Sequence, residues 1–336
     1  METKRRSHLG PIAITALCFF AASVGHVLAD PSATEHMKRR PQGILTGMPF
    51  MANVASRTFV DDLGRKIYLA KEPQRIVSLA PSVTETLYAI GAGDRVVGVT
   101  EFCDYPPDAR SKPKVAYSNP NLETIVALKP DLVLAPRDFI RPDILAKLEQ
   151  LKIAAFVVDA KRLDDIPTEM QTIGRILGRS DEANRVALEI RRHILEVKAK
   201  TERLPRLRVL YVLNTEPLIS VGPGSFIHEL IEIAGGQNVA AGASTPYPRL
   251  SIEAVLKEDP QLIIFPHGST EGIPQGERDL WKRWVGMSAV KASAFHQVPS
   301  DVLNRPGPRV VEGLDALAAI IHPELSGSAR AANPAP

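Results

Sequence analysis

The side chains that could catalyse a reaction or hold a metal are scattered along this sequence. The histidines after residue 30 share no ligand spacing; they are His36, His193, His228, His267, His296 and His322. A zinc-protease helix carries its second histidine four residues after the first, but Glu232 stands four residues after His228. No Gly-x-Ser-x-Gly element and no phosphate-binding loop occurs in the sequence. These observations argue against an enzyme and against a resident metal or cofactor, and they favour a binding protein.

Two glutamates are of interest because the sequence around them repeats at an offset of 130 residues. Glu123 lies in NLETIV and Glu253 in SIEAVL, and each precedes a proline by seven residues. Each falls at the second position of a predicted helix, where a carboxylate is favoured by about 0.3–1 kcal/mol. One interpretation is that they only stabilise these helices. The other is that they form a matched pair of acidic points for two arginines on a pseudo-symmetric partner.

The composition is that of a packed soluble chain. Hydrophobic residues make up 44% of the 336 residues and charged residues 24%, which is ordinary for a globular protein. The net charge is only +3, so a nucleic acid is not an expected partner. With 28 prolines the chain is expected to form many short elements. The length suits about two domains.

Residues 1–29 have the pattern of a cleaved secretory signal peptide. Lys4, Arg5 and Arg6 precede an apolar stretch over residues 11–24, and Val27-Leu28-Ala29 supplies small residues before a cut after Ala29. An uncleaved anchor is the alternative. We therefore expect export to the periplasm. After the signal peptide, we expect a flexible leader over residues 30–56. After cleavage Cys103 would be the only remaining cysteine. A single cysteine cannot form an internal disulfide, so we expect a buried thiol.

From residue 58 onward, short apolar runs alternate with helical patterns. Predicted strands cover residues 75–80, 96–100, 132–135, 153–158, 209–213, 218–221 and 262–265, and predicted helices cover 142–151, 226–234, 252–258 and 309–321. Further helices are predicted after Ser82, with Glu85 completing a capping box and Gly91 ending the helix, and after Asn121. This alternation predicts an α/β fold with mostly parallel sheets.

One helix is expected to be much longer than the others. Ala183, Ala187, Ile190, Ile194 and Val197 recur at steps of three and four residues, which predicts an amphipathic helix over about 181–203. At 1.5 Å per residue it is roughly 35 Å long. With the 130-residue repeat, this predicts two similar lobes, 57–180 and 205–325, joined by one long backbone helix over 181–204 and followed by a disordered tail at 326–336. A pocket is expected between the lobes.

The sequence resembles one family of transport receptors. The residues that carry the resemblance are RIVSLAPSVTETLYAIGAG from Arg75, DYPP from Asp104, NLE from Asn121 and LKPDLV from Leu128. Together they are similar to the Fe/B12 periplasmic-binding domain, and the similarity extends over about residues 58–324. This family contains the substrate-binding proteins of ABC importers for cobalamin, ferric siderophores and haem. Residues 104–107 and 246–253 are most similar to the cobalamin binders.

The resemblance implies a fold and a set of partners. It implies a non-enzymatic, monomeric periplasmic receptor with two α/β lobes bridged by a rigid helix. Such a receptor captures a corrinoid between its lobes and delivers it to an inner-membrane permease with its ATPase. The resemblance also implies that Glu123 and Glu253 dock onto arginines of that permease. The same role for a ferric siderophore or for haem is the alternative.

The resemblance also places the ligand residues. Phe102, Tyr117 and Tyr247 match aromatic positions around the corrin, and the polar residues at cleft positions are Ser82, Asp301, Asn304 and Arg305. Val302, Leu303 and Pro136 replace bulkier aromatic residues. Arg137 is a candidate to meet a negatively charged siderophore, and Arg305 is a second one. His267 is either a ligand to cobalt or haem iron at the mouth of the cleft or a solvated loop histidine.

Overall fold

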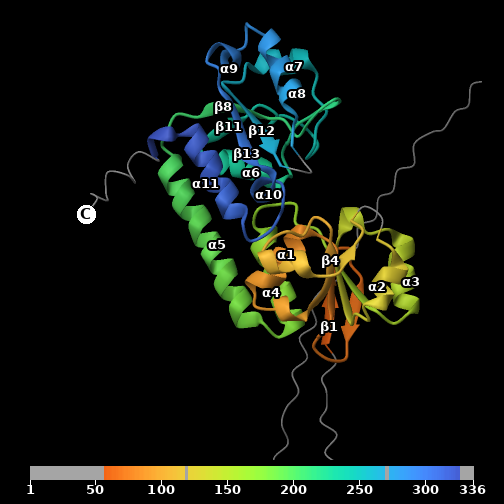
Figure 1. Cartoon of the computed structure of the whole chain (residues 1–336). Helices are drawn as coiled ribbons and strands as arrows, with labels where there is room; N and C mark the ends of the chain where they lie inside the picture. Colours follow the sequence, from red (N-terminus) through yellow and green to blue (C-terminus); the bar gives the residue numbers. More distant parts are fainter. Residues whose placement is uncertain (1–56, 118–119, 269–271, 326–336) are drawn as a thin grey trace, which may run out of the picture. The chain divides into compact units, whose positions relative to one another are not determined.

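The structure is a computed structural model and describes residues 57–117, 120–268 and 272–325. The predicted signal peptide, the leader and the tail lie outside these residues. The described residues belong to one compact unit. Within them, no helix combines the length and the apolar character that crossing a membrane requires. Two parallel sheets, one in each half of the described chain, organise the structure (Figure 1).

The first sheet has five parallel strands in the order β5-β4-β3-β6-β7. Its strands are β3 (Ile76–Ser78), β4 (Val96–Thr100), β5 (Lys114–Val115), β6 (Leu132–Pro136) and β7 (Ala154–Val158). The connecting helices are α1 (Pro81–Ala89), η1 (Gly93–Arg95), η2 (Pro107–Ser111), α2 (Leu122–Ala127), η3 (Arg137–Phe139), α3 (Pro142–Gln150) and α4 (Asp165–Leu177). An antiparallel hairpin of β1 (Arg57–Val60) and β2 (Lys66–Leu69) precedes them.

The second sheet has four parallel strands in the order β11-β8-β12-β13. Its strands are β8 (Leu207–Tyr211), β11 (Gly236–Asn238), β12 (Leu262–His267) and β13 (Phe295–Pro299), and a small hairpin is formed by β9 (Asn214–Thr215) and β10 (Leu218–Ile219). The helices are α6 (Phe226–Ile233), α7 (Ile252–Glu258), α8 (Gln275–Asp279), η4 (Leu280–Arg283), α9 (Ser288–Lys291), α10 (Ser300–Leu303) and α11 (Val310–Ile321). The predicted α/β class with parallel sheets is confirmed.

Both sheets are buried on two faces. Successive side chains of a strand point to opposite sides, so one strand can contribute residues to two apolar clusters. In β6, Leu132 and Leu134 join one apolar cluster, whereas Val133 and Ala135 join another. The first of these clusters continues into the second half of the chain. It also contains residues of α1, α4, α5, α6 and α11, so one apolar layer is shared by both halves.

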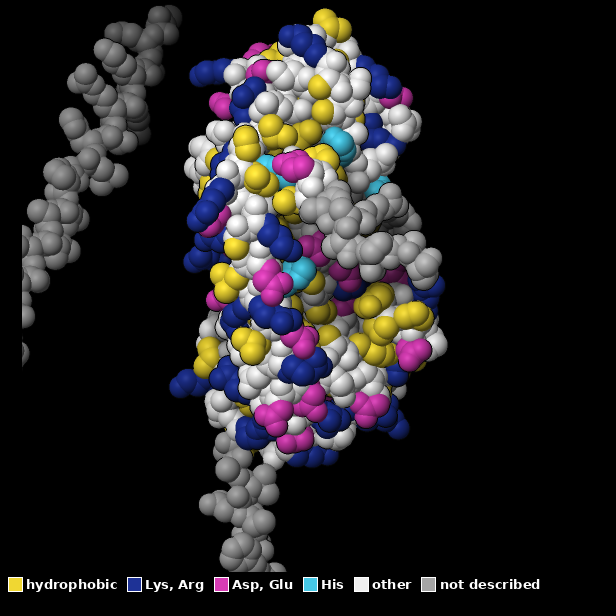
Figure 2. All heavy atoms as spheres, turned by 90° about the vertical axis from the view of Figure 1, so that its left-hand side faces the viewer, with side chains coloured by type: hydrophobic (Ala, Val, Ile, Leu, Met, Phe, Trp, Pro, Cys, Tyr) yellow, Lys and Arg dark blue, Asp and Glu magenta, His cyan; other side chains and the backbone are white. Residues whose placement is uncertain are grey.

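The helix α5 (Ser180–Thr201) is the longest described element. Ala183, Ala187, Ile190 and Val197 bury its inner face, and it packs against α4 and α11 (Figure 1). Its outer face carries ion pairs four residues apart, such as Arg185 with Glu189. Figure 2 shows basic and acidic side chains interspersed over this side of the described chain, with no continuous basic surface.

The 130-residue repeat of the sequence reappears in the backbone. Asn121 accepts the N–H groups of residues 123 and 124 at the start of α2, and Ser251 accepts that of Ala254 at the start of α7. Each helix is followed by a residue with positive φ, Lys129 at 49° and Asp259 at 46°, and then by a buried strand. The two segments are therefore equivalent in local structure as well as in sequence.

The predicted capping box at the start of α1 is wrong. The helix begins at Pro81, whose missing N–H suits the first helical position, so Ala80 and not Ser82 is the cap. Ser82 lies inside the first turn. Glu85 is turned away from the helix end, and its buried carboxylate accepts hydrogen bonds from Arg309 at 2.9 Å. The predicted end of this helix is correct, because Gly91 follows it with φ of 73°.

Candidate ligand-binding cleft

A cavity of about 570 Å³ lies between the two halves of the described chain. The first half contributes the start of α1 and the residues that follow strands β4, β6 and β7. The second half contributes the start of α6, residues 246–247 and residues 304–306. Ligands of parallel sheets commonly bind beyond the carboxyl ends of the strands, and this cavity has that position in the first sheet.

The cavity gathers residues that are far apart in the sequence. Seven of the predicted ligand residues line it: Ser82, Phe102, Tyr117, Arg137, Tyr247, Asn304 and Arg305. Asp301 does not line it but pairs with Arg305, with 2.8 Å between Oδ1 and Nη2. The sequence interpretation missed several further lining residues, among them Asp138, Phe139, Asp159, Lys161, Glu169 and Phe226.

Aromatic rings form one wall of the cavity. The ring of Tyr117 meets Phe102 edge-on, with centroids 5.2 Å apart, and lies against Phe139 at 4.3 Å with a tilt of 32°. Tyr247 comes from the other half of the chain and is half exposed. Such rings offer broad apolar faces with few rotatable bonds. The wall therefore suits a large flat ligand.

The Tyr247 hydroxyl is held in its protonated form. Burial raises its pKa, and the charges of Asp138 and Asp159 raise it further. A phenol with a raised pKa remains a hydrogen-bond donor at neutral pH, so Tyr247 can donate to a polar ligand edge.

The lysine and the two arginines among the described lining residues are all paired with carboxylates. Arg137 lies 3.1 Å and Lys161 lies 3.0 Å from the same oxygen, Oδ2 of Asp159. Arg305 lies 3.3 Å from Glu85, 3.0 Å from Asp104 and 2.8 Å from Asp301. The wall of the cavity is thus balanced in charge rather than cationic.

Two ion-pair contacts tie the halves of the chain together beside the cavity. At one, Glu85 of α1 binds Arg309 through both carboxylate oxygens and also meets Arg305. Arg309 additionally covers the ring of Tyr105 at 4.2 Å. At the other, Glu229 of α6 accepts the Leu163 N–H at 2.9 Å and the Arg162 side chain at 3.2 Å. We name these the Glu85 contact and the Glu229 contact.

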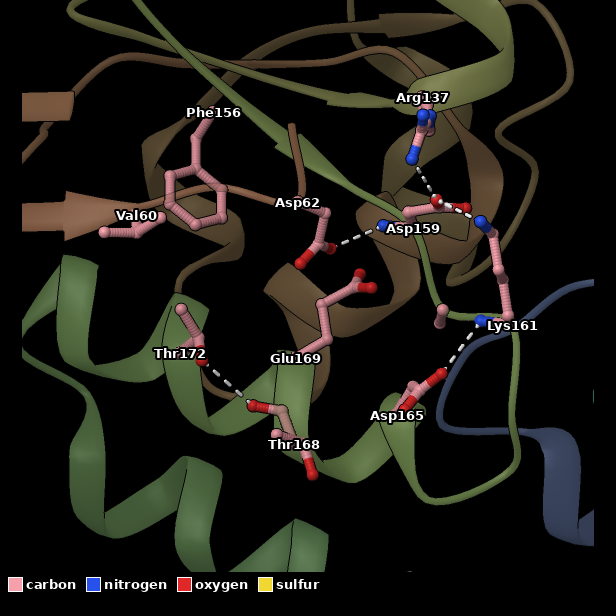
Figure 3. Close-up of a pocket in the computed structure, with 11 residues that line it drawn as sticks. Val60, Asp62, Arg137, Phe156, Asp159, Lys161, Asp165, Thr168, Glu169 and Thr172 are labelled. Atoms are coloured by element: carbon pink, nitrogen blue, oxygen red, sulfur yellow. Dashed lines mark hydrogen bonds and ion pairs between the residues drawn. The ribbon is translucent and has the colours of Figure 1, made fainter. Parts of the chain in front are cut away.

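A smaller cavity of about 370 Å³ adjoins the first (Figure 3). It shares Arg137, Asp159, Lys161 and Glu169 with the larger one. Figure 3 shows the Glu169 carboxylate rising from α4 toward Asp62 and Asp159. Burial, followed by the charges of neighbouring carboxylates, raises the pKa of Glu169 well above that of an ordinary glutamate. Glu169 therefore keeps its proton to a higher pH than an ordinary glutamate does.

The comparisons with known proteins identify the family. Residues 76–301 match the model of a family described as "Periplasmic binding protein". A "Vitamin B12-binding protein" of Vibrio vulnificus is 36% identical over 245 residues, which cover 72% of this chain and 88% of that protein. The chain belongs to the periplasmic binding protein family. The resemblance noted in the sequence is therefore confirmed.

Solved structures of periplasmic binding proteins share the fold. The crystal structure of the periplasmic vitamin B12 binding protein BtuF of Vibrio cholerae matches with a TM-score of 0.64 and 31% identity, over 74% of this chain and 97% of that one. The periplasmic haem-binding protein RhuT from Roseiflexus sp. RS-1 matches with a TM-score of 0.67 at 24% identity, over 74% and 98%. The second likeness supports the fold alone.

Other sequence-predicted residues of this periplasmic binding protein lie outside the cleft. Glu123 and Glu253 are both exposed at the second positions of α2 and α7. His267 is exposed at the end of β12 and is not among the described residues that line the cavity. Cys103 is buried, and its thiol is hydrogen-bonded to the hydroxyls of Thr84 and Thr100. Burial raises the pKa of this thiol. The described residues contain no group of three or more metal-ligating side chains that could hold an ion.

The raised pKa of Glu169 predicts a pH-dependent gain in stability for Glu169→Gln. In the unfolded chain the Glu169 carboxyl loses its proton at about pH 4.3, whereas in the folded protein it keeps the proton to higher pH. The free energy of unfolding of the wild type therefore falls as the pH rises from that of the unfolded carboxyl toward that of the folded one. Glutamine is neutral at every pH. We expect the variant to unfold ~3 °C higher at pH 7.5, about 1 kcal/mol, and at the wild-type temperature near pH 4. Calorimetry at both pH values measures the two unfolding temperatures. The control is Glu149→Gln, on the exposed face of α3. An equal shift of the Glu169→Gln variant at both pH values would contradict the prediction.

Proposed function

We propose that this periplasmic binding protein captures cobalamin in the cavity between its halves and delivers it to the permease of an ABC importer. The names of its relatives from Vibrio, at 36% and 31% identity, support the choice of ligand. A Bacillus subtilis relative, an ABC transporter substrate-binding lipoprotein with 30% identity, supports the importer role. The matches to these three relatives cover 72%, 74% and 80% of this chain.

The observation that carries the choice of ligand is the charge balance of the cavity wall. A ferric siderophore or haem brings carboxylates or other anionic groups, and proteins usually meet such groups with unpaired arginines or lysines. In the described lining, Arg137 and Lys161 are paired with Asp159, and Arg305 is paired with three carboxylates. A corrin ring fringed with neutral amides needs no such cations.

The polar groups of the cavity suit an amide fringe. Ser82 and Asn304 line it, and a hydroxyl or a carboxamide can both donate to and accept from an amide. The Asn304 carbonyl already accepts the Tyr211 hydroxyl at 2.6 Å, which fixes the direction of its side chain. The aromatic wall of Phe102, Tyr117 and Phe139 would cover the face of the ring.

The remaining parts of the receptor follow from this role. We propose that residues 57–180 and 205–325 act as two lobes, with α5 as the rigid connection between them. We propose further that the protein is an exported, monomeric, non-enzymatic receptor. Its exposed Glu123 and Glu253 would contact arginines of the permease, because they occupy equivalent positions at the starts of α2 and α7.

Titration of the mature protein distinguishes the ligands. Trp281, Trp284 and the cleft tyrosines supply intrinsic fluorescence, and we expect cyanocobalamin to quench it with a dissociation constant in the micromolar range or below. Haem is expected to bind at least ~10-fold more weakly, because its carboxylates find no unpaired cation. Absence of cobalamin binding at micromolar concentration would overturn the proposal, and tight binding of haem alone would assign the receptor to haem.

A further inference from the structure

The structure assigns to Asp159 a role in selectivity: we propose that this carboxylate excludes anionic ligands by pairing with two of the three cations in the described cleft wall, Arg137 and Lys161. This inference rests on the proposed function and deepens it, because it names the residue that rejects the competing class of ligand. Asp159 is the residue that follows strand β7, at the carboxyl end of the first sheet.

A single carboxylate oxygen of Asp159 pairs with both cations. Arg137 Nη1 and Lys161 Nζ both lie within 3.1 Å of Asp159 Oδ2, so the two positive groups stand at most about 6 Å apart. Figure 3 shows the two side chains converging on Asp159 from opposite sides. A ligand carboxylate could pair with the same two cations only by displacing the carboxylate of Asp159 from them. In this sense Asp159 acts as an internal substitute for an anionic ligand.

The protein fixes this carboxylate more firmly than it fixes the cations. The side chain of Asp159 is 13% exposed, whereas those of Arg137 and Lys161 are 47% and 58% exposed. The Asp159 N–H donates to Asp62 Oδ2 at 2.7 Å, which anchors the backbone at the end of β7. The cations are therefore at the cavity surface, accessible to a ligand, and only their carboxylate partner prevents them from binding an anion.

The surroundings add to the rejection of anions. Asp138, a further carboxylate, also lines the larger cavity. Because exposed ion pairs contribute little to stability, the loss of the Asp159 charge should leave the fold intact. Its main effect should be on which ligands the cleft accepts. A residue with these properties determines specificity by opposing the wrong ligand.

The test compares Asp159→Asn with Asp138→Asn. Both variants remove one negative charge from the same cleft, but only the first releases Arg137 and Lys161. The probes are metal-free protoporphyrin IX, which carries two carboxylates, its neutral dimethyl ester, and cyanocobalamin. For Asp159→Asn we expect the affinity for the dicarboxylate, relative to the diester, to rise at least ~10-fold. For Asp138→Asn the ratio should change less than ~3-fold.

Two further measurements complete the test. Adding Arg137→Gln to Asp159→Asn should remove most of the gain, and the gain should shrink as salt is raised. Thermal unfolding verifies that each variant is folded, and Asp159→Ser serves if the asparagine variant is not. An equal change in the two single variants, or no change in either, would overturn the inference.

This outcome is separate from that of the proposed function. If the wild-type protein does not bind cyanocobalamin, the proposed function fails, while the change in the dicarboxylate-to-diester ratio still decides the role of Asp159. If the wild-type protein already prefers the dicarboxylate to the diester, the role of Asp159 is overturned even when cobalamin binds.

Discussion

Reversal of both docking glutamates, Glu123→Lys with Glu253→Lys, is expected to reduce cobalamin uptake at least ~100-fold. If the permease presents arginines to these positions, the reversal places like charges together, and this costs several kcal/mol of association free energy. Ligand affinity should persist, because neither residue is among those that line the cavity. Uptake of labelled cyanocobalamin by cells that express the cognate importer measures the first effect, and fluorescence titration measures the second.

The matched control for this reversal is the pair Glu149→Lys with Glu258→Lys. These exposed glutamates lie at the ends of α3 and α7, so the same charge is reversed in both halves but away from the starts of α2 and α7. We expect the control to transport at close to the wild-type rate. Normal uptake by the Glu123/Glu253 double variant would show that these carboxylates serve only their helices.

Loss of the Glu85 contact is expected to have the largest effect on stability. Glu85→Ala removes the carboxylate that Arg309 binds through two hydrogen bonds and that Arg305 also meets. The Glu85 side chain is 1% exposed and that of Arg305 is 10% exposed, so the arginines would lose a partner in a place that water reaches poorly. Breaking a buried pair in this way costs about 3–5 kcal/mol, which corresponds to a fall of about 10 °C in the unfolding temperature.

Differential scanning calorimetry of the apo protein checks this expectation. Glu85→Gln should lie between the alanine variant and the wild type, because an amide retains hydrogen bonding but loses the charge. Glu149→Ala, on the exposed face of α3, is the control and should shift the transition by less than ~2 °C. An alanine variant at Glu85 that unfolds at the wild-type temperature would mean that this contact does not stabilise the fold.

The elements of the fold could be predicted because their signals are local. Asn121 and Ser251 mark the starts of α2 and α7, and the apolar spacing of Ala183, Ala187 and Ile190 marks α5; both signals need only neighbouring residues. The cap of α1 was mispredicted for a local reason as well. Pro81 moved the start of the helix by two residues, from after Ser82 to after Ala80, and left Glu85 free to turn toward the other half of the chain.

The site could be predicted only in part, because its charge balance depends on distant partners. The sequence suggests Arg305 as a cation for the ligand, but its partner Glu85 is 220 residues away, and no sequence pattern connects the two. Asp159 and Lys161 were missed although one signal existed. They follow β7 as Arg137 follows the neighbouring strand β6, and residues after adjacent parallel strands meet at one edge of a sheet.

The Glu85 and Glu229 contacts, together with α5, have a consequence for how cargo leaves the protein. A receptor whose two parts are already joined by ion pairs on more than one side needs little rearrangement to accept a guest, so capture should cost it little ordering entropy. The same ion pairs would also oppose an opening of the two halves that releases the bound ligand. If the protein delivers its ligand to an importer, as proposed, unloading would require the permease to open the Glu85 and Glu229 contacts.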